Sequence, residues 1–331
     1  MNRKLFLPLL VLMLAISACN LQSATPTLVP TAVLPATDTV LPPAATDTPV
    51  PPPAATVTPV PPTPALTSTP VTPSGSGLTL DQLKNATYQT PSLGKTVTLV
   101  NGAYSEGSGA NGFSVQMLDT YALGDLNGDG KADAAIILVE NGGGTGQFES
   151  VIAVTDQGGK PHQQSQALLG DRVQIKSVDI SSGVVHLDML VQGSNDPMCC
   201  PSLAQKQNYW LIDNRLWLMR VTSTISGTVH YINVDSPGIW TTVSNPFTVN
   251  GGVTVLPFEN TLAYKIYKTD GTKVNESSLT VTPVTGTAGT FTHIFNLSSA
   301  GITDWVIIQF IDVSAADGST ISLGSVILMA H

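Results

Sequence analysis

The sequence of 331 residues predicts a mainly β protein, in which an α+β domain with an antiparallel sheet is followed by a β-sandwich. Short apolar or alternating runs, bounded by Gly, Asn and Asp, recur from about residue 113 to the end of the chain. Before residue 77 the composition is different, rich in Pro and Thr and without aromatic residues after the first 20 positions. We therefore expect four segments: a signal peptide (1–18), a tether (19–76), an α+β domain (77–222) and a sandwich (223–331).

The N-terminus has the features of a secretory signal. The basic pair Arg3-Lys4 precedes an apolar run from Leu5 to Ile16, which is too short to cross a bilayer as a permanent helix. The residues that follow, Ile-Ser-Ala-Cys at 16–19, resemble the lipobox of bacterial lipoproteins, in which the cysteine carries the lipid. This resemblance implies a fatty-acylated (for example palmitate-bearing) Cys19 and an extracytoplasmic protein anchored to the bacterial cell membrane. The alternative, an ordinary secretory signal, leaves Cys19 as a free thiol.

Residues 21–76 have the composition of a disordered Pro/Thr-rich linker. They contain 15 of the 24 prolines and only two charged side chains, Asp38 and Asp47. Such a segment buries too little apolar area to offset the entropy of ordering it. In the extended conformation that proline favours, at about 3.1 Å per residue, it reaches at most roughly 170 Å. We expect it to hold the folded part away from the membrane.

The α+β domain begins with a helix-start signal and continues with strand signals. Thr79 followed by Gln82 is a capping box and predicts a helix over 80–86. Strands are expected at 115–123, 134–140, 148–155, 172–180, 184–191, 208–212 and 216–220. Tight turns are expected at Asp213-Asn214 and at Ser181-Ser182-Gly183.

A short loop in this domain has the spacing of a cation site. Oxygen ligands are available at its positions 1, 3, 5, 7 and 9, from the side chains of Asp125, Asn127, Asp129 and Asp133 and the backbone carbonyl of Lys131. Gly130 permits the sharp turn, and this set suits a hard cation such as Ca²⁺ in a structural role. Ile136 stands where an EF-hand has Glu, and the loop resembles the DxNxDGxxD loop of integrin-type FG-GAP repeats. The alternative is an Asp/Asn-rich turn that only solvates its side chains.

Two adjacent cysteines, Cys199 and Cys200, lie in the segment Asn195–Pro201. In an oxidising compartment we expect a vicinal disulfide between them. Two alternatives are a reduced pair and a soft-metal or redox site completed by His162 or His186. The stretch from about 118 to 218, with its segments GDLNGDGKADAA, GDRVQIKSVDI and NDPMCCP, resembles an uncharacterised bacterial lipoprotein domain without known activity.

The last hundred residues have short strands with turns about every ten residues, which is typical of a β-sandwich. Leu262, Tyr264 and Ile266 alternate with less apolar residues, and apolar strands are expected at 305–313 and 321–329. Seven features in order resemble the immunoglobulin-like domain of bacterial spore-germination proteins: Ser236-Pro237, Asn245-Pro246, Val249–Gly252, Phe258-Glu259, Asp270-Gly271, Gly289 with Phe291, and Ser314–Ser319. The resemblance implies a binding or spacer module on the cell surface, with no catalytic residues to carry over.

The remaining patterns indicate a binding protein rather than an enzyme. The chain has no GxSxG, HExxH or SxxK motif, and its five histidines are scattered. A net charge of −9 without a basic cluster argues against nucleic acid as a partner. We predict a membrane-anchored, non-catalytic binding or scaffolding protein of the cell envelope with a calcium loop, whose partner is a cell-wall component or an envelope protein. The alternatives are an envelope hydrolase acting on glycan, with its site in 77–222, and a pure spacer.

Overall fold

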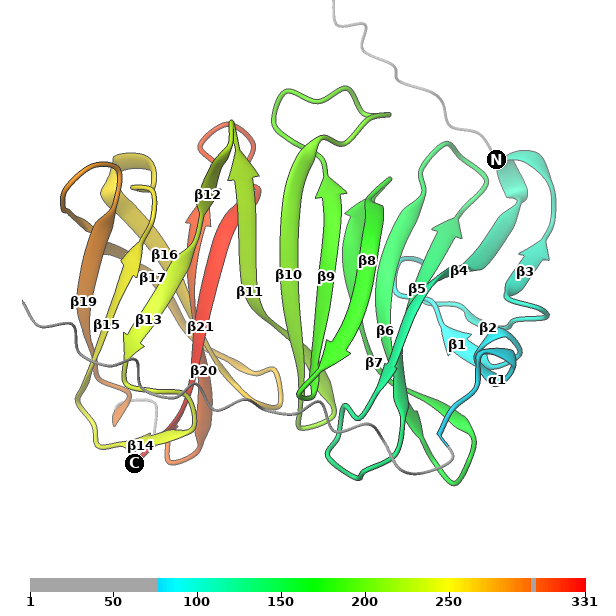
Figure 1. The fold of residues 1–331 in the computed structure, drawn as a ribbon, viewed down its shortest axis with the longest axis horizontal. Helices are drawn as coiled ribbons and strands as arrows, with labels where there is room; N and C mark the ends of the chain where they lie inside the picture. The colour runs from blue at the N-terminus through cyan, green and yellow to red at the C-terminus, as the bar shows by residue number, and fades with distance from the viewer. Residues whose placement is uncertain (1–76, 299–301) are drawn as a thin grey trace, which may run out of the picture. The chain divides into compact units, whose positions relative to one another are not determined.

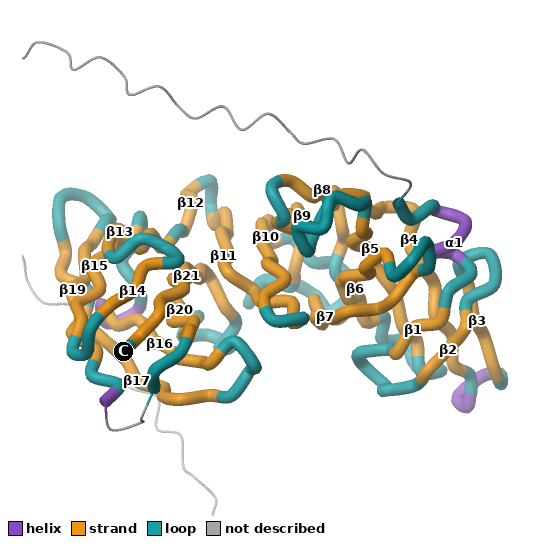
Figure 2. Tube along the Cα trace, turned by 90° about the horizontal axis from the view of Figure 1, so that it is seen from below, coloured by secondary structure: helices purple, strands orange, loops and turns teal. Residues whose placement is uncertain are grey.

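The computed structural model describes residues 77–298 and 302–331 (Figure 1). The predicted signal peptide, Cys19 and the tether lie outside the described residues. Figure 2 shows strands almost throughout the described part, so the predicted mainly β fold is confirmed. Among these residues no helix has the length and apolar character needed to cross a membrane.

The chain enters the fold through the capped helix α1 (Leu80–Lys84). The Thr79 hydroxyl accepts a hydrogen bond from the Gln82 backbone N–H, and the Gln82 side chain accepts one from the Thr79 backbone N–H, as the capping box predicts. The helix ends two residues before the predicted end, at Lys84, and buries Leu83. The strands β1 (Thr87–Gln89) and β2 (Thr96–Thr98) follow as an antiparallel pair.

A five-stranded antiparallel sheet forms the centre of the first part. Its order is β3 (Ala103–Glu106), β4 (Phe113–Gly124), β5 (Asp133–Asn141), β6 (Phe148–Asp156) and β7 (Pro161–Asp171). Strands β5 and β6 are buried along nearly their whole length because both faces of the sheet are covered. Ile136 and Ile152 pack toward α1, β1 and β2, whereas Ile137 and Val151 pack toward strands β8–β11. The first part therefore has three layers.

The largest sheet has ten strands and runs through both predicted domains (Figure 1). Its main order is β17-β16-β20-β21-β11-β10-β9-β8, with β12 beside β11 and β14 beside β21. The strands are β8 (Gln174–Ser181), β9 (Val184–Val191), β10 (Leu203–Ile212), β11 (Arg215–Ile225), β12 (Thr228–His230), β14 (Thr241–Val243), β16 (Thr261–Lys268), β17 (Lys273–Thr280), β20 (Trp305–Val313) and β21 (Thr320–Ala330). The predicted boundary at 222/223 falls inside β11, which pairs with β21 at Arg220–Gly324 and Val221–Leu323.

The C-terminal part is a β-sandwich. A second sheet of order β13 (Ile232–Ser236), β15 (Phe247–Val253), β19 (Gly289–Phe295) and β18 (Thr282–Pro283) packs against β16, β20 and β21. The core between them is rich in aromatic rings, and the Phe291 and Phe310 ring centroids lie 4.9 Å apart. Leu262, Tyr264 and Ile266 all face this core, as the alternation predicts.

Both predicted hairpin turns are present. Asp213 and Asn214 have φ of 47° and 62°, and Ser182 and Gly183 have φ of 52° and 74°. Two successive residues of positive φ make the twist of a two-residue turn match that of the flanking strands. The first turn joins β10 to β11, and the second joins β8 to β9.

Candidate functional site

The predicted cation loop joins β4 to β5 and is folded around its first carboxylate. Asp125 Oδ1 accepts hydrogen bonds from the backbone N–H of Gly128 (2.6 Å) and Asp129 (3.2 Å), and its Oδ2 accepts one from Gly130 (2.8 Å). Asn127 Oδ1 accepts one from the Asp129 N–H at 2.9 Å. The loop thus has a defined turn, with the side chains of Asn127, Asp129 and Lys131 exposed.

Asp133 closes the base of this loop. Its side chain is fully buried, and its two oxygens accept hydrogen bonds from the Leu126 N–H (3.0 Å) and the Asp156 N–H (2.9 Å). Burial raises the pKa of the Asp133 carboxyl. Asp133 therefore ties the loop to the end of β6.

The donor chemistry of the loop fits calcium. The side chains of Asp125, Asn127, Asp129 and Asp133 and the Lys131 carbonyl are all oxygen donors, which Ca²⁺ prefers, and of these Asp133 already accepts a backbone hydrogen bond on each oxygen. Asp125 Oδ2 and Asn127 Oδ1 each accept only one hydrogen bond in the loop, so lone pairs remain for a cation. Within residues 77–298 and 302–331, no group of three or more His, Cys, Asp and Glu side chains is assembled for a metal ion. Cation binding by this loop thus needs its carbonyl and amide oxygens as well as its carboxylates.

The cysteine loop between β9 and β10 is organised by Asp196. Its carboxylate accepts hydrogen bonds from the Gly193 N–H (2.8 Å), the Ser202 N–H (2.6 Å) and the Ser202 hydroxyl (2.7 Å), which lower its pKa. The Sγ atoms of Cys199 and Cys200 are joined as a vicinal disulfide. The two histidines considered for a redox site lie on strands: His162 on β7, and His186 on β9, where it is hydrogen-bonded to Asn208.

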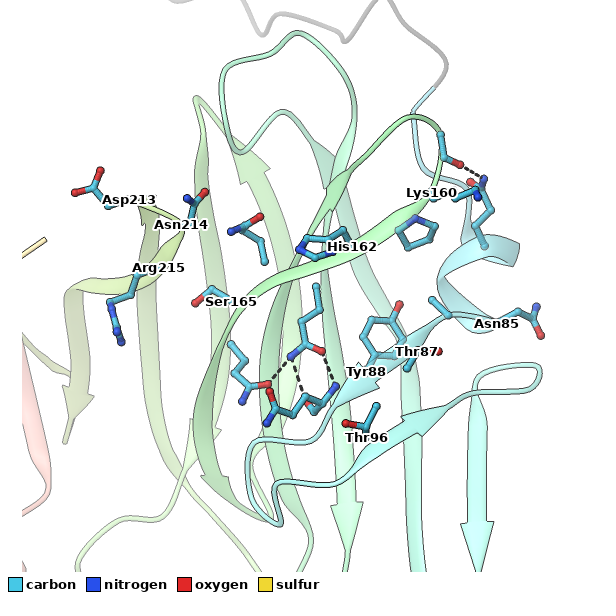
Figure 3. Close-up of a pocket in the computed structure, with 18 of the residues that line it drawn as sticks. Asn85, Thr87, Tyr88, Thr96, Lys160, His162, Ser165, Asp213, Asn214 and Arg215 are labelled. Carbon is cyan, nitrogen blue, oxygen red and sulfur yellow. Dashed lines mark hydrogen bonds between the residues drawn. The ribbon is translucent and has the colours of Figure 1, made fainter. Parts of the chain in front are cut away.

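A wide polar groove of about 1320 Å³ lies beside β7 (Figure 3). Figure 3 shows His162 and Ser165 of β7, with Lys160 just before this strand, between Asn85 and Thr87 on one side and the turn Asp213-Asn214 on the other. Most of the lining side chains are amides, hydroxyls and isolated charges of both signs. Such a groove offers hydrogen bonds without a dominant charge.

The amides of this groove are already organised into a network. The Gln163 side chain accepts a hydrogen bond from the Gln89 N–H (2.7 Å) and donates one to the Gln89 carbonyl (3.0 Å). Ser165 Oγ accepts one from the Leu216 N–H at 2.8 Å. These side chains of β7 satisfy backbone groups of β1 and β11. The sequence analysis did not identify the groove, although the run His162-Gln163-Gln164-Ser165-Gln166 is an unusually dense set of hydrogen-bonding side chains.

The comparisons with known proteins identify the C-terminal part. Residues 231–319 match the family model described as the immunoglobulin-like domain of bacterial spore germination. The match begins just before β13 and ends just before β21, so it covers most of the sandwich. It confirms the predicted resemblance of this segment, which is an immunoglobulin-like domain. No curated protein and no solved structure matches the chain.

Proposed function

We propose that the chain is a lipid-anchored, non-catalytic binding protein of the bacterial cell envelope. The observation that supports the binding function is the immunoglobulin-like family match at residues 231–319, whose description refers to bacterial spore germination. The match covers a domain without catalytic motifs, and the main sheet of that domain continues into the preceding part through β11 and β21. We infer that the tether presents both parts together, as one binding unit.

The acidity of the carboxyl groups favours binding over hydrolysis. A glycan hydrolase needs two placed carboxyl groups, one of them with a raised pKa. In the described residues, burial raises the pKa of Asp133, Glu149 and Asp312, and none of these three lines the groove. Asp270, which does line it, has a lowered pKa because it accepts hydrogen bonds from Thr272. The many amides and hydroxyls of the groove therefore suit a polar partner.

The anchor and the cation complete the proposal. Cys19 carries the lipid, and residues 21–76 hold the folded part at a distance from the membrane. Ca²⁺ at the loop Asp125–Asp133 stabilises the junction of β4, β5 and β6, because the bound cation offsets the repulsion of Asp125 and Asp129. The membrane is thus one partner, and a cell-wall component or an envelope protein is the other.

Sedimentation with envelope material tests the binding function. The full chain, purified in detergent with Ca²⁺ present, is mixed with lipid-free cell-wall material and centrifuged. We expect the chain to appear in the pellet in a saturable manner, and the wall material to show no new reducing ends after prolonged incubation. A chain that neither sediments with wall material nor changes its elution volume in size-exclusion chromatography with solubilised envelope proteins would contradict the proposal, and release of reducing ends would support the hydrolase instead.

A further inference from the structure

Three of the four tryptophans meet on one side of the ten-stranded sheet. The Trp210 and Trp240 rings are nearly parallel, with an interplanar angle of 20° and centroids 6.3 Å apart. The Trp305 ring meets Trp240 edge-on, at 74° and 5.2 Å. We call Trp210, Trp240 and Trp305 the tryptophan platform. They come from β10, from the residue before β14 and from the start of β20, so the sheet order brings them together.

Trp240 is held in an unusual conformation at this platform. Its φ is 60°, in the left-handed region that a bulky residue rarely adopts. Its backbone N–H donates to the Ile327 carbonyl at 2.8 Å, which fixes that conformation. The side chain nevertheless remains 48% exposed, and its neighbour Ile239 is 50% exposed. A strained backbone that keeps a large aromatic side chain in solvent is typical of a binding site rather than of a core.

The surroundings of the platform define the chemistry of the ligand. Beside Trp210 and Trp240 lies a mostly apolar hollow of about 250 Å³ without any charged side chain, lined also by Ser182, Gly183, Val184, Leu211 and Ile212. On the same face of β9 and β10, two residues beyond the Val184–Trp210 pair, His186 Nδ1 and Asn208 Oδ1 are 3.1 Å apart. An exposed aromatic side chain next to planar polar groups suits a ring that is apolar on its faces and hydroxylated at its edge.

We propose that the tryptophan platform binds an uncharged pyranose ring of a glycan. The exposed side chain of Trp240 packs on the C–H face of the sugar, supported by the Trp210 ring that stacks on it, and Ser182, His186 and Asn208 hydrogen-bond the sugar hydroxyls. The uncharged hollow and the net charge of −9 favour a neutral glycan over an anionic one. This inference rests on the proposed binding function and names the class of its ligand.

Binding is measured with the full chain in detergent and soluble neutral oligomers of N-acetylglucosamine and of glucose, by tryptophan fluorescence and calorimetry. Saturable binding by at least one of them is expected, and Trp240→Ala should weaken it about three- to tenfold, as loss of one aromatic contact does. Trp240→Phe should retain part of the affinity. The matched control is Phe258→Ala, because Phe258 is 63% exposed and lies outside the platform, and this variant should bind like the wild type.

A second readout does not depend on folding of a variant. N-bromosuccinimide oxidises exposed tryptophans first, so Trp240 should react before Trp217, which is only 7% exposed. The bound oligomer should protect Trp240 in the wild-type chain, as peptide mass analysis would show. The platform proposal would be overturned if neither oligomer binds and Trp240→Ala sediments with wall material as well as the wild type does. The binding function would still stand in that case. Failure to sediment with wall material, together with no complex with solubilised envelope proteins, would instead contradict the binding function.

Discussion

The layered part (77–225) and the sandwich (231–331) use their apolar residues differently. In the layered part β5 and β6 are covered on both faces, so their sequences are nearly continuous apolar runs. In the sandwich β15 and β16 face one core and alternate. The cation loop, the cysteine loop and most of the polar groove belong to the layered part, whereas the family match covers the sandwich. The part that matches a known family and the part that holds most of the candidate sites are therefore different, although the ten-stranded sheet runs through both.

Substitutions in the two hydrophobic cores should have the largest effects on the free energy of unfolding and should show whether the two parts unfold together. Phe310→Ala in the sandwich should lower the free energy of unfolding by about 3–5 kcal/mol, and Ile152→Ala in the layered part by about 2–5 kcal/mol, because both side chains are fully buried. Side chains of β11 pack against β20 and β21, so we expect one transition in urea for both variants. Two separate transitions, each moved by only one substitution, would show that the parts unfold independently.

Glu149 in the layered part and Asp312 in the sandwich are buried carboxyls with raised pKa values, and they titrate over different pH ranges. Burial raises the pKa of Glu149 to about 7 and that of Asp312 to about 6. A raised carboxyl pKa gives stability that is complete below the unfolded value and lost as pH rises through the folded value. Unfolding free energy should therefore fall between about pH 4 and 7, by up to about 3 kcal/mol for each group.

Two isosteric variants separate these contributions. Glu149→Gln should remove the decrease in unfolding free energy between pH 4.5 and about 7, and Asp312→Asn should remove the decrease between pH 3.8 and about 6. Urea unfolding at a series of pH values measures both. Stability that rises with pH over this range in the wild type would contradict the assignment.

Calcium should bind in the layered part only. If the loop Asp125–Asp133 binds Ca²⁺, a hundredfold excess over the dissociation constant should add about 2.7 kcal/mol to the free energy of unfolding. Asp125→Asn with Asp129→Asn should abolish this gain, whereas Asp213→Asn, in an exposed turn of the same part, should preserve it. Calorimetric titration and thermal unfolding measure the effect. No heat of binding and no thermal shift at millimolar Ca²⁺ would leave the loop as a hydrogen-bonded turn.

The smallest effect concerns the one α-helix of the described residues. Thr79→Ala removes the cap of α1 and should cost about 1 kcal/mol. Thr248→Ala, an exposed position of β15 in the sandwich, should change stability by no more than about 0.5 kcal/mol. Equal losses for the two variants in urea unfolding would mean that the cap contributes nothing beyond a surface threonine.

Local patterns predicted much of the fold. The capping box, the two-residue turns and β9 and β20 all lie where short-range signals place them. Strand β10 begins five residues before its predicted start, because Gln205 and Gln207 resemble solvated residues in the sequence. In the structure both are buried: the Gln207 amide donates to Gln205 Oε1 at 2.6 Å, and the Tyr209 hydroxyl donates to Gln207 Oε1 at 2.6 Å. A buried glutamine whose amide is hydrogen-bonded is still polar, so the hydrophobic pattern of the sequence does not reveal its burial.

The candidate sites were less predictable because they depend on contacts between distant residues. The cation loop is contiguous, so its spacing was visible in the sequence. The groove combines α1, β1, β7 and the turn after β10, and the tryptophan platform combines residues 210, 240 and 305. The packing of α1, β1 and β7 beside the turn after β10 assembles the groove, and the strand order of the large sheet brings β10 and β20 of the platform close together, so a local sequence pattern shows at most one segment of either site.

The most direct measurement concerns Cys19, on which the envelope location depends. Bacteria that express the wild-type chain or Cys19→Ser are grown with an alkyne-tagged fatty acid and then fractionated. We expect label on the wild-type chain in the membrane fraction, and a Cys19→Ser chain without label. An unlabelled wild-type chain with an uncut leader in the soluble interior of the cell would contradict the proposed anchored binding protein.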